Sequence, residues 1–220
     1  MDILLGLIGL AGGLLCAAAD ILLDLKGPDN KKIGRFSIMD SNWVKMAYWR
    51  FPASIVLAAA SVPMYYMGLY AMKNQLQGSS PLLANLFWLS STIGALGGLF
   101  IHATLCYFPM IYKNLHEKNQ AQAAEEIIED IFQGIKIPFI VLFLLLTVVP
   151  SVIMIIAVLR GVLHIPYVFL VLNPLGLTLI GITLRKISPR YFSDLPGICM
   201  PSLGLGMIGL ASALSAAGIL

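Results

Sequence analysis

The sequence predicts an all-α protein, a polytopic bundle of about six transmembrane helices with both termini outside. Hydrophobic residues make up 59% of the 220 residues and charged residues 11%, whereas soluble domains have roughly 45–50% and about 25%. The mean hydropathy is +0.88. The apolar residues form long blocks without the alternation of a membrane barrel, and only helices or closed barrels pair every backbone group in lipid.

Six apolar blocks supply the expected membrane spans, because about 20 mostly apolar residues cross a hydrocarbon core of roughly 30 Å as a helix. The blocks are residues 3–25, 44–72, 82–112, 138–159, 166–184 and 198–220. We therefore expect residues 1–220 to form a single transmembrane domain. Between the third and fourth blocks, residues 117–136 have apolar side chains at helical spacing and acidic ones opposite, which predicts a short cytoplasmic amphipathic helix.

Basic residues predict the orientation of the bundle. Twelve of the 14 lysines and arginines fall in or beside the connections after the first, third and fifth blocks, and only Lys73 and Arg160 fall on the other side. The positive-inside rule places the twelve in the cytoplasm and both termini outside. We expect a multi-pass protein of the cell membrane, the bacterial inner membrane. The net charge of +3 gives no reason to expect nucleic acid as a partner.

A few ionisable residues lie inside the apolar blocks, where a charge costs several kcal/mol unless it is paired or hydrated. Asp20 and Asp24 are one helical turn apart on one face of the first block. Arg50 opens the second block and His102 lies in the third. The predicted topology places all four at one depth in the inner leaflet, which indicates a polar pocket open toward the cytoplasm.

The predicted site has two catalytic candidates, Asp20 and His102, because a carboxyl group and an imidazole can transfer protons near neutral pH. Five more residues are the candidates for substrate binding: Asp24, Arg50, Cys106, Tyr107 and Asn173. Two structural alternatives remain open, in which Asp24 and Arg50 reach the membrane interface and Asp20 pairs with Arg50 to join helices. No nucleotide, metal or nucleophile-elbow motif occurs, so we expect neither a metal nor a cofactor.

Small residues recur at helix-packing spacing in three blocks. Gly9 and Gly13 are four apart in the first block, Gly94 and Gly98 are four apart in the third, and residues 204–209 hold three glycines. Such faces allow the backbones of neighbouring helices to approach closely in lipid. They predict internal packing, with a homo-oligomer formed through the same faces as the alternative.

Four short segments resemble a family of small, functionally uncharacterised bacterial multi-pass membrane proteins. They are residues 18–23, 49–51, 97–103 and 173–175. The resemblance brings no activity with it. It implies that one residue from each segment belongs to a common set, namely Asp20, Arg50, His102 and Asn173.

Two functions from different classes fit these observations, and a purely structural role is the third alternative. In the first, the inner-leaflet pocket binds or converts a lipophilic small molecule that enters from the bilayer, by isomerase- or cyclase-like acid–base chemistry. In the second, the chain is a small oligomeric proton-coupled carrier or an accessory subunit of a membrane complex. A pocket sealed toward the outer face favours the first, whereas a polar route past Asn173 to that face favours the second. The partners expected are membrane lipids or a lipophilic molecule.

Overall fold

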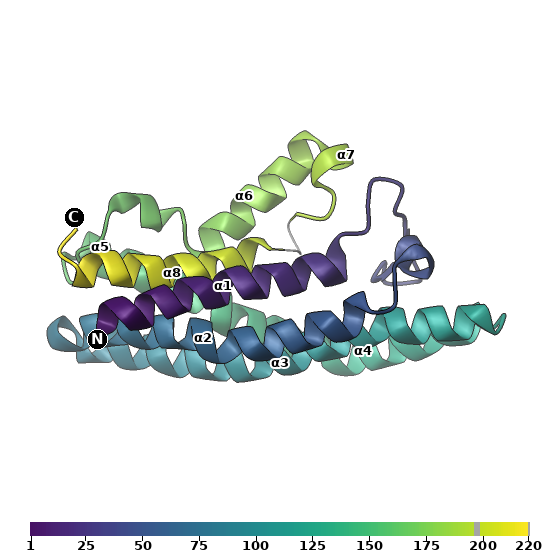
Figure 1. Ribbon diagram of the computed structural model, residues 1–220, viewed down its shortest axis with the longest axis horizontal. Coiled ribbons are helices and arrows are strands. Elements are labelled where there is room, and N and C mark those ends of the chain that lie inside the picture. The colour runs from purple at the N-terminus through teal and green to yellow at the C-terminus, as the bar shows by residue number, and fades with distance from the viewer. Residues whose placement is uncertain (196–198, 220) are drawn as a thin grey trace.

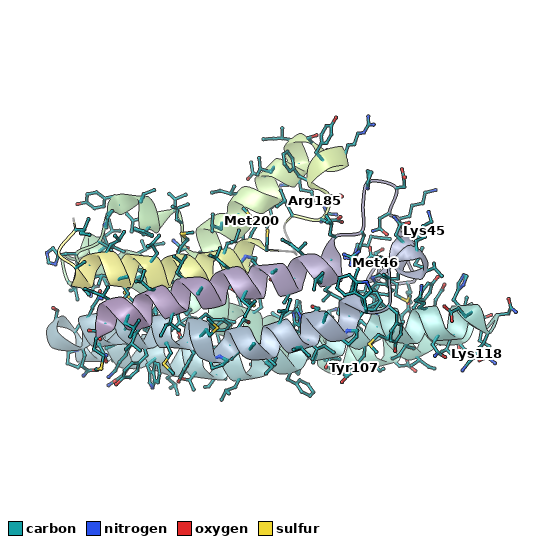
Figure 2. All side chains as sticks on the ribbon, viewed as in Figure 1. Lys45, Met46, Tyr107, Lys118, Arg185 and Met200 are labelled. Atoms are coloured by element: carbon teal, nitrogen blue, oxygen red, sulfur yellow. The ribbon has the colours of Figure 1, made fainter. Side chains whose placement is uncertain are left out.

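The computed structural model describes residues 1–195 and 199–219 and shows an elongated, mostly helical bundle (Figure 1). Its long elements are α1 (Asp2–Asp24), α2 (Arg50–Ser79), α3 (Pro81–Glu117) and a continuous helix over Ala121–Leu159. The N- and C-termini lie at the same end, here called the terminal end (Figure 1). The opposite end, where Lys45 and Lys118 lie (Figure 2), is here called the basic end. The all-α prediction is confirmed.

Helix α1 packs between α2 and α8 (Met200–Ala216). Three glycines, one from each helix, meet at one level. The Cα of Gly9 lies against Gly68, and a Cβ added to Gly68 would be 3.0 Å from the Cα of Gly209. The absence of side chains at this level lets three backbones come together, which places the predicted seam in the first and last blocks at internal contacts.

Helix α3 and the helix over Ala121–Leu159 pack against each other and have about 55 Å of length each at 1.5 Å per residue, far more than a hydrocarbon core requires. The second of them consists of α4 (Ala121–Phe143), a π-helical segment η2 (Leu144–Val148) and α5 (Val149–Leu159). The π-helical turn ends just before Pro150, which has no N–H to donate and whose ring displaces a preceding carbonyl.

The basic end carries a small folded layer between α1 and α2. Strands β1 (Lys32–Ile33) and β2 (Met39–Asp40) pair antiparallel, and a 3-10 turn, η1 (Ser41–Lys45), follows. This layer packs on the ends of α3 and α4 through a buried cluster that includes Met39, Trp43 and Ile128. The expected amphipathic stretch is thus the end of α3 and the first part of α4, and Ala124 and Ile128 of its apolar face are buried against this layer, whereas Ile127 is exposed.

Within residues 1–195 and 199–219, four helices and not six are long and apolar enough to cross a membrane: α1, α2, α3 and the continuous helix over Ala121–Leu159. The prediction of six spans is therefore wrong. The last apolar block forms α8, which has 17 residues and is about 25 Å long. The fifth block is not one helix, because it divides into the turn η3 (Tyr167–Leu170) and α6 (Pro174–Ile187), with α7 (Pro189–Phe192) after it.

The start of α6 explains that division. The side-chain oxygen of Asn173 accepts a hydrogen bond from the N–H of Gly176 at 2.9 Å, and Pro174 occupies the first helical position, a combination that begins helices. Helix α6 has 14 residues, so it is about 21 Å long. It diverges from the bundle axis (Figure 1), and its first turn lies against Gly204 of α8.

The inside–outside assignment remains a prediction that labelling can check. In a variant without native cysteines, a cysteine placed at Lys73 or His164 should react with a membrane-impermeant maleimide in intact cells. A cysteine at Lys31 or Lys118 should be protected until the cells are opened. The expectation follows from the uneven distribution of basic residues between the two ends. If only the cysteines at positions 31 and 118 react in intact cells, the orientation is opposite to the one predicted.

Candidate functional site

A cavity of about 390 Å³ lies inside the bundle, toward the basic end. Helices α1, α2, α3, α4 and α8 all contribute to its wall, with Thr147 of η2. Aliphatic and aromatic side chains form most of the lining, and the polar groups are few. Pockets that bind small molecules usually have this character and a volume of about 300–1,000 Å³.

Asp20 of α1 and His102 of α3 meet at this cavity. The Nδ1 atom of His102 is 3.4 Å from Oδ1 of Asp20, and each side chain is 14% exposed. The hydroxyl of Ser202 on α8 donates to Oδ2 of the same carboxylate at 2.5 Å. The structure therefore brings together the two residues predicted to be catalytic, with a serine from a third helix as their neighbour.

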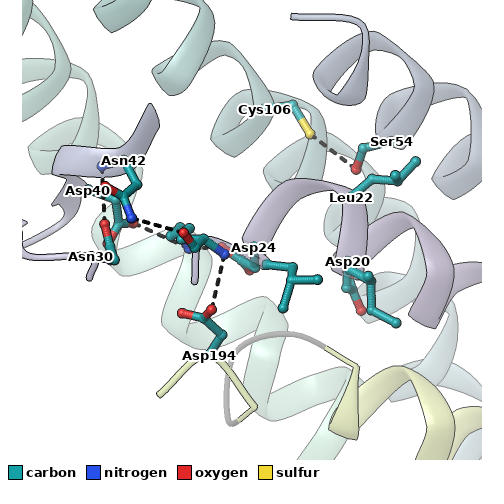
Figure 3. A network of polar contacts seen from close by, with 12 residues as sticks. Asp20, Leu22, Asp24, Asn30, Asp40, Asn42, Ser54, Cys106 and Asp194 are labelled. Atoms are coloured by element: carbon teal, nitrogen blue, oxygen red, sulfur yellow. Dashed lines mark hydrogen bonds and ion pairs between the residues drawn. The ribbon is translucent and has the colours of Figure 1, made fainter. Parts of the chain in front are cut away.

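Ser54 of α2 holds these helices in register. Its hydroxyl donates to the carbonyl oxygen of Ala19 on α1 at 2.7 Å and lies 2.9 Å from Nε2 of His102 on α3. The thiol of Cys106 is 3.6 Å from the hydroxyl oxygen of Ser54 (Figure 3). Ser54 is fully buried and does not line the cavity, so it contacts His102 from behind.

Sequence reasoning did not identify Ser54 and Ser202 as site residues. Serines are common in membrane helices, where they usually bond to their own backbone or pack. One signal was present, since Ser54 lies one helical turn after Arg50, at the depth assigned to the predicted pocket. Ser202 lies near the start of the last apolar block and had no comparable signal.

Arg50 does not join the pair. Its guanidinium donates to the carbonyl oxygens of Leu22, Ile21 and Leu25 at 2.9–3.1 Å, and it does not line the cavity. The last carbonyls of a helix have no partner within it. Arg50 therefore caps the C-terminus of α1, where a positive charge also complements the helix dipole.

Asp24 lines the cavity but belongs to a charged network at the basic end. Lys26 forms ion pairs with Asp24 and, at 3.2 Å, with Asp40. The carboxylate of Asp194 accepts from the backbone N–H of Lys26 at 3.0 Å (Figure 3). Burial alone lowers the pKa of Lys26, but the charges and hydrogen bonds of Asp24 and Asp40 together raise it above its ordinary value. Lys26 thus stays charged, and the charge of Asp24 is neutralised locally.

The other three predicted substrate-binding residues lie outside the cavity lining. Cys106 is buried behind His102 and contacts Ser54. Tyr107 is half-exposed on the surface of the bundle. Asn173 is fully buried and caps α6, and its amide donates to the carbonyl oxygen of Leu170 at 2.7 Å. Cys106 and Asn173 therefore pack and cap helices in this structure, and Tyr107 lies on the surface.

The cavity lining contains acidic side chains. Asp20 and Asp24 contribute carboxyl groups and His102 an imidazole, whereas no lysine or arginine from residues 1–195 or 199–219 lines the cavity. Cys16, Thr147 and Ser202 add neutral polar atoms. Such a lining can accept hydrogen bonds, exchange a proton and attract a cation, but it offers no fixed positive charge to an anion.

These features define a multi-pass membrane protein with four long apolar helices and a buried acid–imidazole pair beside an apolar cavity. The chain belongs to DUF6796, a family of unknown function whose model matches residues 1–217. Comparison with curated proteins and with solved structures finds no match. The family covers nearly the whole chain, so the predicted resemblance to an uncharacterised family is confirmed to that extent, and it brings no activity.

Proposed function

We propose that the protein binds a lipophilic small molecule in the cavity and that Asp20 and His102 exchange a proton with its polar group. The observation that supports this most is the Asp20–His102 pair, 3.4 Å apart, at the wall of a mainly apolar cavity of about 390 Å³. A carboxyl group and an imidazole side by side in a membrane are costly. They form an acid–base pair that can protonate one position of a ligand and deprotonate another, as an isomerase or cyclase requires.

The charge of the lining favours one class of ligand. A phosphate or carboxylate head group would meet the carboxyl group of Asp20 without a lysine or arginine among the described lining residues, and two like charges in a low dielectric repel strongly. A hydroxyl, carbonyl or amine would find acceptors and a donor instead. The proposed ligand is therefore a lipophilic alcohol, ketone or amine.

The packing around the cavity supports entry from the side. One wall is formed by α1 and α8 and the facing wall by α4, which packs on α3. Among the described residues, neither α1 nor α8 makes an extensive contact with α4. A lipophilic molecule can then pass from the bilayer between α4 and α8 at the level of Phe143 and Ser202, which line the cavity from the two sides.

The core on the terminal side of the cavity favours a binding protein over a carrier. Beyond Tyr65, fully or largely buried apolar side chains fill the space between the helices, among them Leu69, Phe87, Met154 and Ile208. Asn173, which would mark a polar route to the far side, is instead used to cap α6. A cavity with an apolar floor suits a ligand that enters and leaves by the same opening.

Ligand binding can be tested with the purified protein. Native mass spectrometry with solvent extraction should reveal a co-purified lipophilic molecule without an anionic head group. Thermal unfolding should then compare a long-chain alcohol, the amine of the same chain and the carboxylate of the same chain. We expect the alcohol and the amine to raise the melting temperature and the carboxylate to leave it unchanged, because no lysine or arginine among the described residues lines the cavity.

A cavity-filling variant provides the control. Gly98 lines the cavity, and among the described residues a Cβ added there would contact only the side chain of Leu146, at 3.4 Å. Gly98→Leu should keep the fold and abolish the ligand-induced stabilisation, whereas Gly134→Leu, at a position with nothing within 4 Å, should retain it. Equal stabilisation by all three probes, or none by any, would contradict the proposal.

A further inference from the structure

The hydroxyl of Ser54, the imidazole of His102 and the carboxylate of Asp20 form a continuous chain. The distances are 2.9 Å from Oγ to Nε2 and 3.4 Å from Nδ1 to Oδ1. A serine, a histidine and an aspartate in this order suggest a nucleophile with its base. The burial of Ser54 argues against that role, because the hydroxyl is fully buried and lies away from the cavity.

The hydrogen bonds of Ser54 decide which ring nitrogen of His102 carries a proton. A serine hydroxyl has one hydrogen and two lone pairs, and a carbonyl oxygen can only accept. The 2.7 Å contact between Oγ and the carbonyl oxygen of Ala19 therefore uses the single hydrogen of Ser54. The lone pairs remain for the Cys106 thiol and for Nε2 of His102. At 2.9 Å Nε2 must then be the donor.

We infer that Ser54 is a positioning residue that keeps a proton on Nε2 of His102 and leaves Nδ1 as the ring nitrogen that exchanges protons. Nδ1 faces Asp20, the residue that lines the cavity. When Nδ1 holds a proton, the imidazolium pairs with the Asp20 carboxylate. Transfer of that proton to a ligand leaves a neutral ring with Nε2–H and a lone pair on Nδ1, and the reverse transfer restores the pair. The exchange rests on the proposed function, whereas the protonation of Nε2 rests on geometry alone.

The same hydrogen-bond network makes Ser54 unfit as an acyl-transfer nucleophile. A nucleophilic serine needs its base to accept the hydroxyl proton. Here the base donates to the hydroxyl, whose own hydrogen is bonded to Ala19. The protein is thus assigned proton transfer and not ester or amide hydrolysis at this position.

Nitrogen NMR of the intact protein can measure the tautomer directly. The chain has three histidines, and a variant with His116→Gln and His164→Gln leaves His102 as the only labelled ring. In the ¹⁵N-histidine protein, Nε2 of His102 should give the signal of a protonated nitrogen with a one-bond coupling to hydrogen. A deprotonated Nε2 with a protonated Nδ1 would overturn the inference, whether or not the protein binds a ligand.

Variants of α2 test the role of Ser54. Ser54→Ala removes the acceptor, so the Nε2 signal should shift toward a mixture of two tautomers, and Ser54→Thr, which keeps a hydroxyl, should restore the wild-type signal. Ser61→Ala is the matched control, because Ser61 is also fully buried on α2 and bonds to Ala58. An unchanged spectrum for Ser54→Ala would refute the positioning role. If Ser54→Ala does not fold, the wild-type spectrum still decides the protonation of Nε2. A wild-type protein that has the expected spectrum but binds no ligand would contradict only the proposed function.

Discussion

Asp20→Asn should leave the protein folded and reduce ligand affinity by about 10–100-fold, which corresponds to about 1.4–2.7 kcal/mol. The amide has the shape of the carboxyl group, but it cannot accept from Ser202 and from a protonated Nδ1 of His102 at once, so the pairing with the imidazolium is lost. It also removes the charge and the proton acceptor at the cavity wall. Titration calorimetry with the alcohol and amine probes measures the affinity, and thermal unfolding checks the fold.

Asp24→Asn is the matched control for that experiment. Asp24 lies one helical turn from Asp20 and lines the same cavity, but its charge is already paired with Lys26. Its loss should therefore reduce ligand affinity much less than the loss of Asp20. Equal losses for the two variants would mean that the general negative charge of the cavity, and not the Asp20–His102 pair, holds the ligand.

Gly9→Ala should destabilise the fold by about 1–3 kcal/mol, the usual cost of overpacking, and Gly9→Leu should prevent folding. A Cβ on Gly9 would lie 2.8 Å from the backbone nitrogen of Gly68. Backbone atoms of a packed helix cannot move aside as the end of a flexible side chain can, so α1 and α2 would have to separate. Unfolding of the purified variants in detergent or bilayer discs measures the change.

Gly134→Ala should stabilise the fold, in contrast to Gly9→Ala. Gly134 lies inside α4, and a Cβ there would have no atom of the described residues within 4 Å. Alanine is favoured over glycine by about 0.8–1.0 kcal/mol inside a helix, so this variant should be slightly more stable than wild type. Destabilisation by both alanine variants to the same extent would show that the three-glycine contact of α1, α2 and α8 does not control stability.

Much of the fold class follows from hydropathy, because the cost of exposing apolar side chains to water does not depend on where helices pack. The first four apolar blocks were expected at residues 3–25, 44–72, 82–112 and 138–159, and each contains or overlaps one of the four long helices. The predicted topology also placed Asp20 and His102 at one depth, and in the structure their side chains are 3.4 Å apart. Both predictions need only the order of apolar and ionisable residues along the chain, which the sequence gives directly.

Tertiary structure decided the rest. Block 166–184 is apolar enough for a span, but Asn173 and Pro174 start a new helix within it, and a hydropathy average does not register a cap. Arg50 bonds to carbonyl oxygens at the end of α1 and not to Asp20. The sequence does not indicate such a partner, because every residue has a carbonyl group. Ser54 acquires its importance from Ala19 and His102, which lie on two other helices. Hydropathy therefore determined that the chain has helices suited to a membrane, whereas the contacts between helices determined which polar groups line the cavity and which only hold the bundle together.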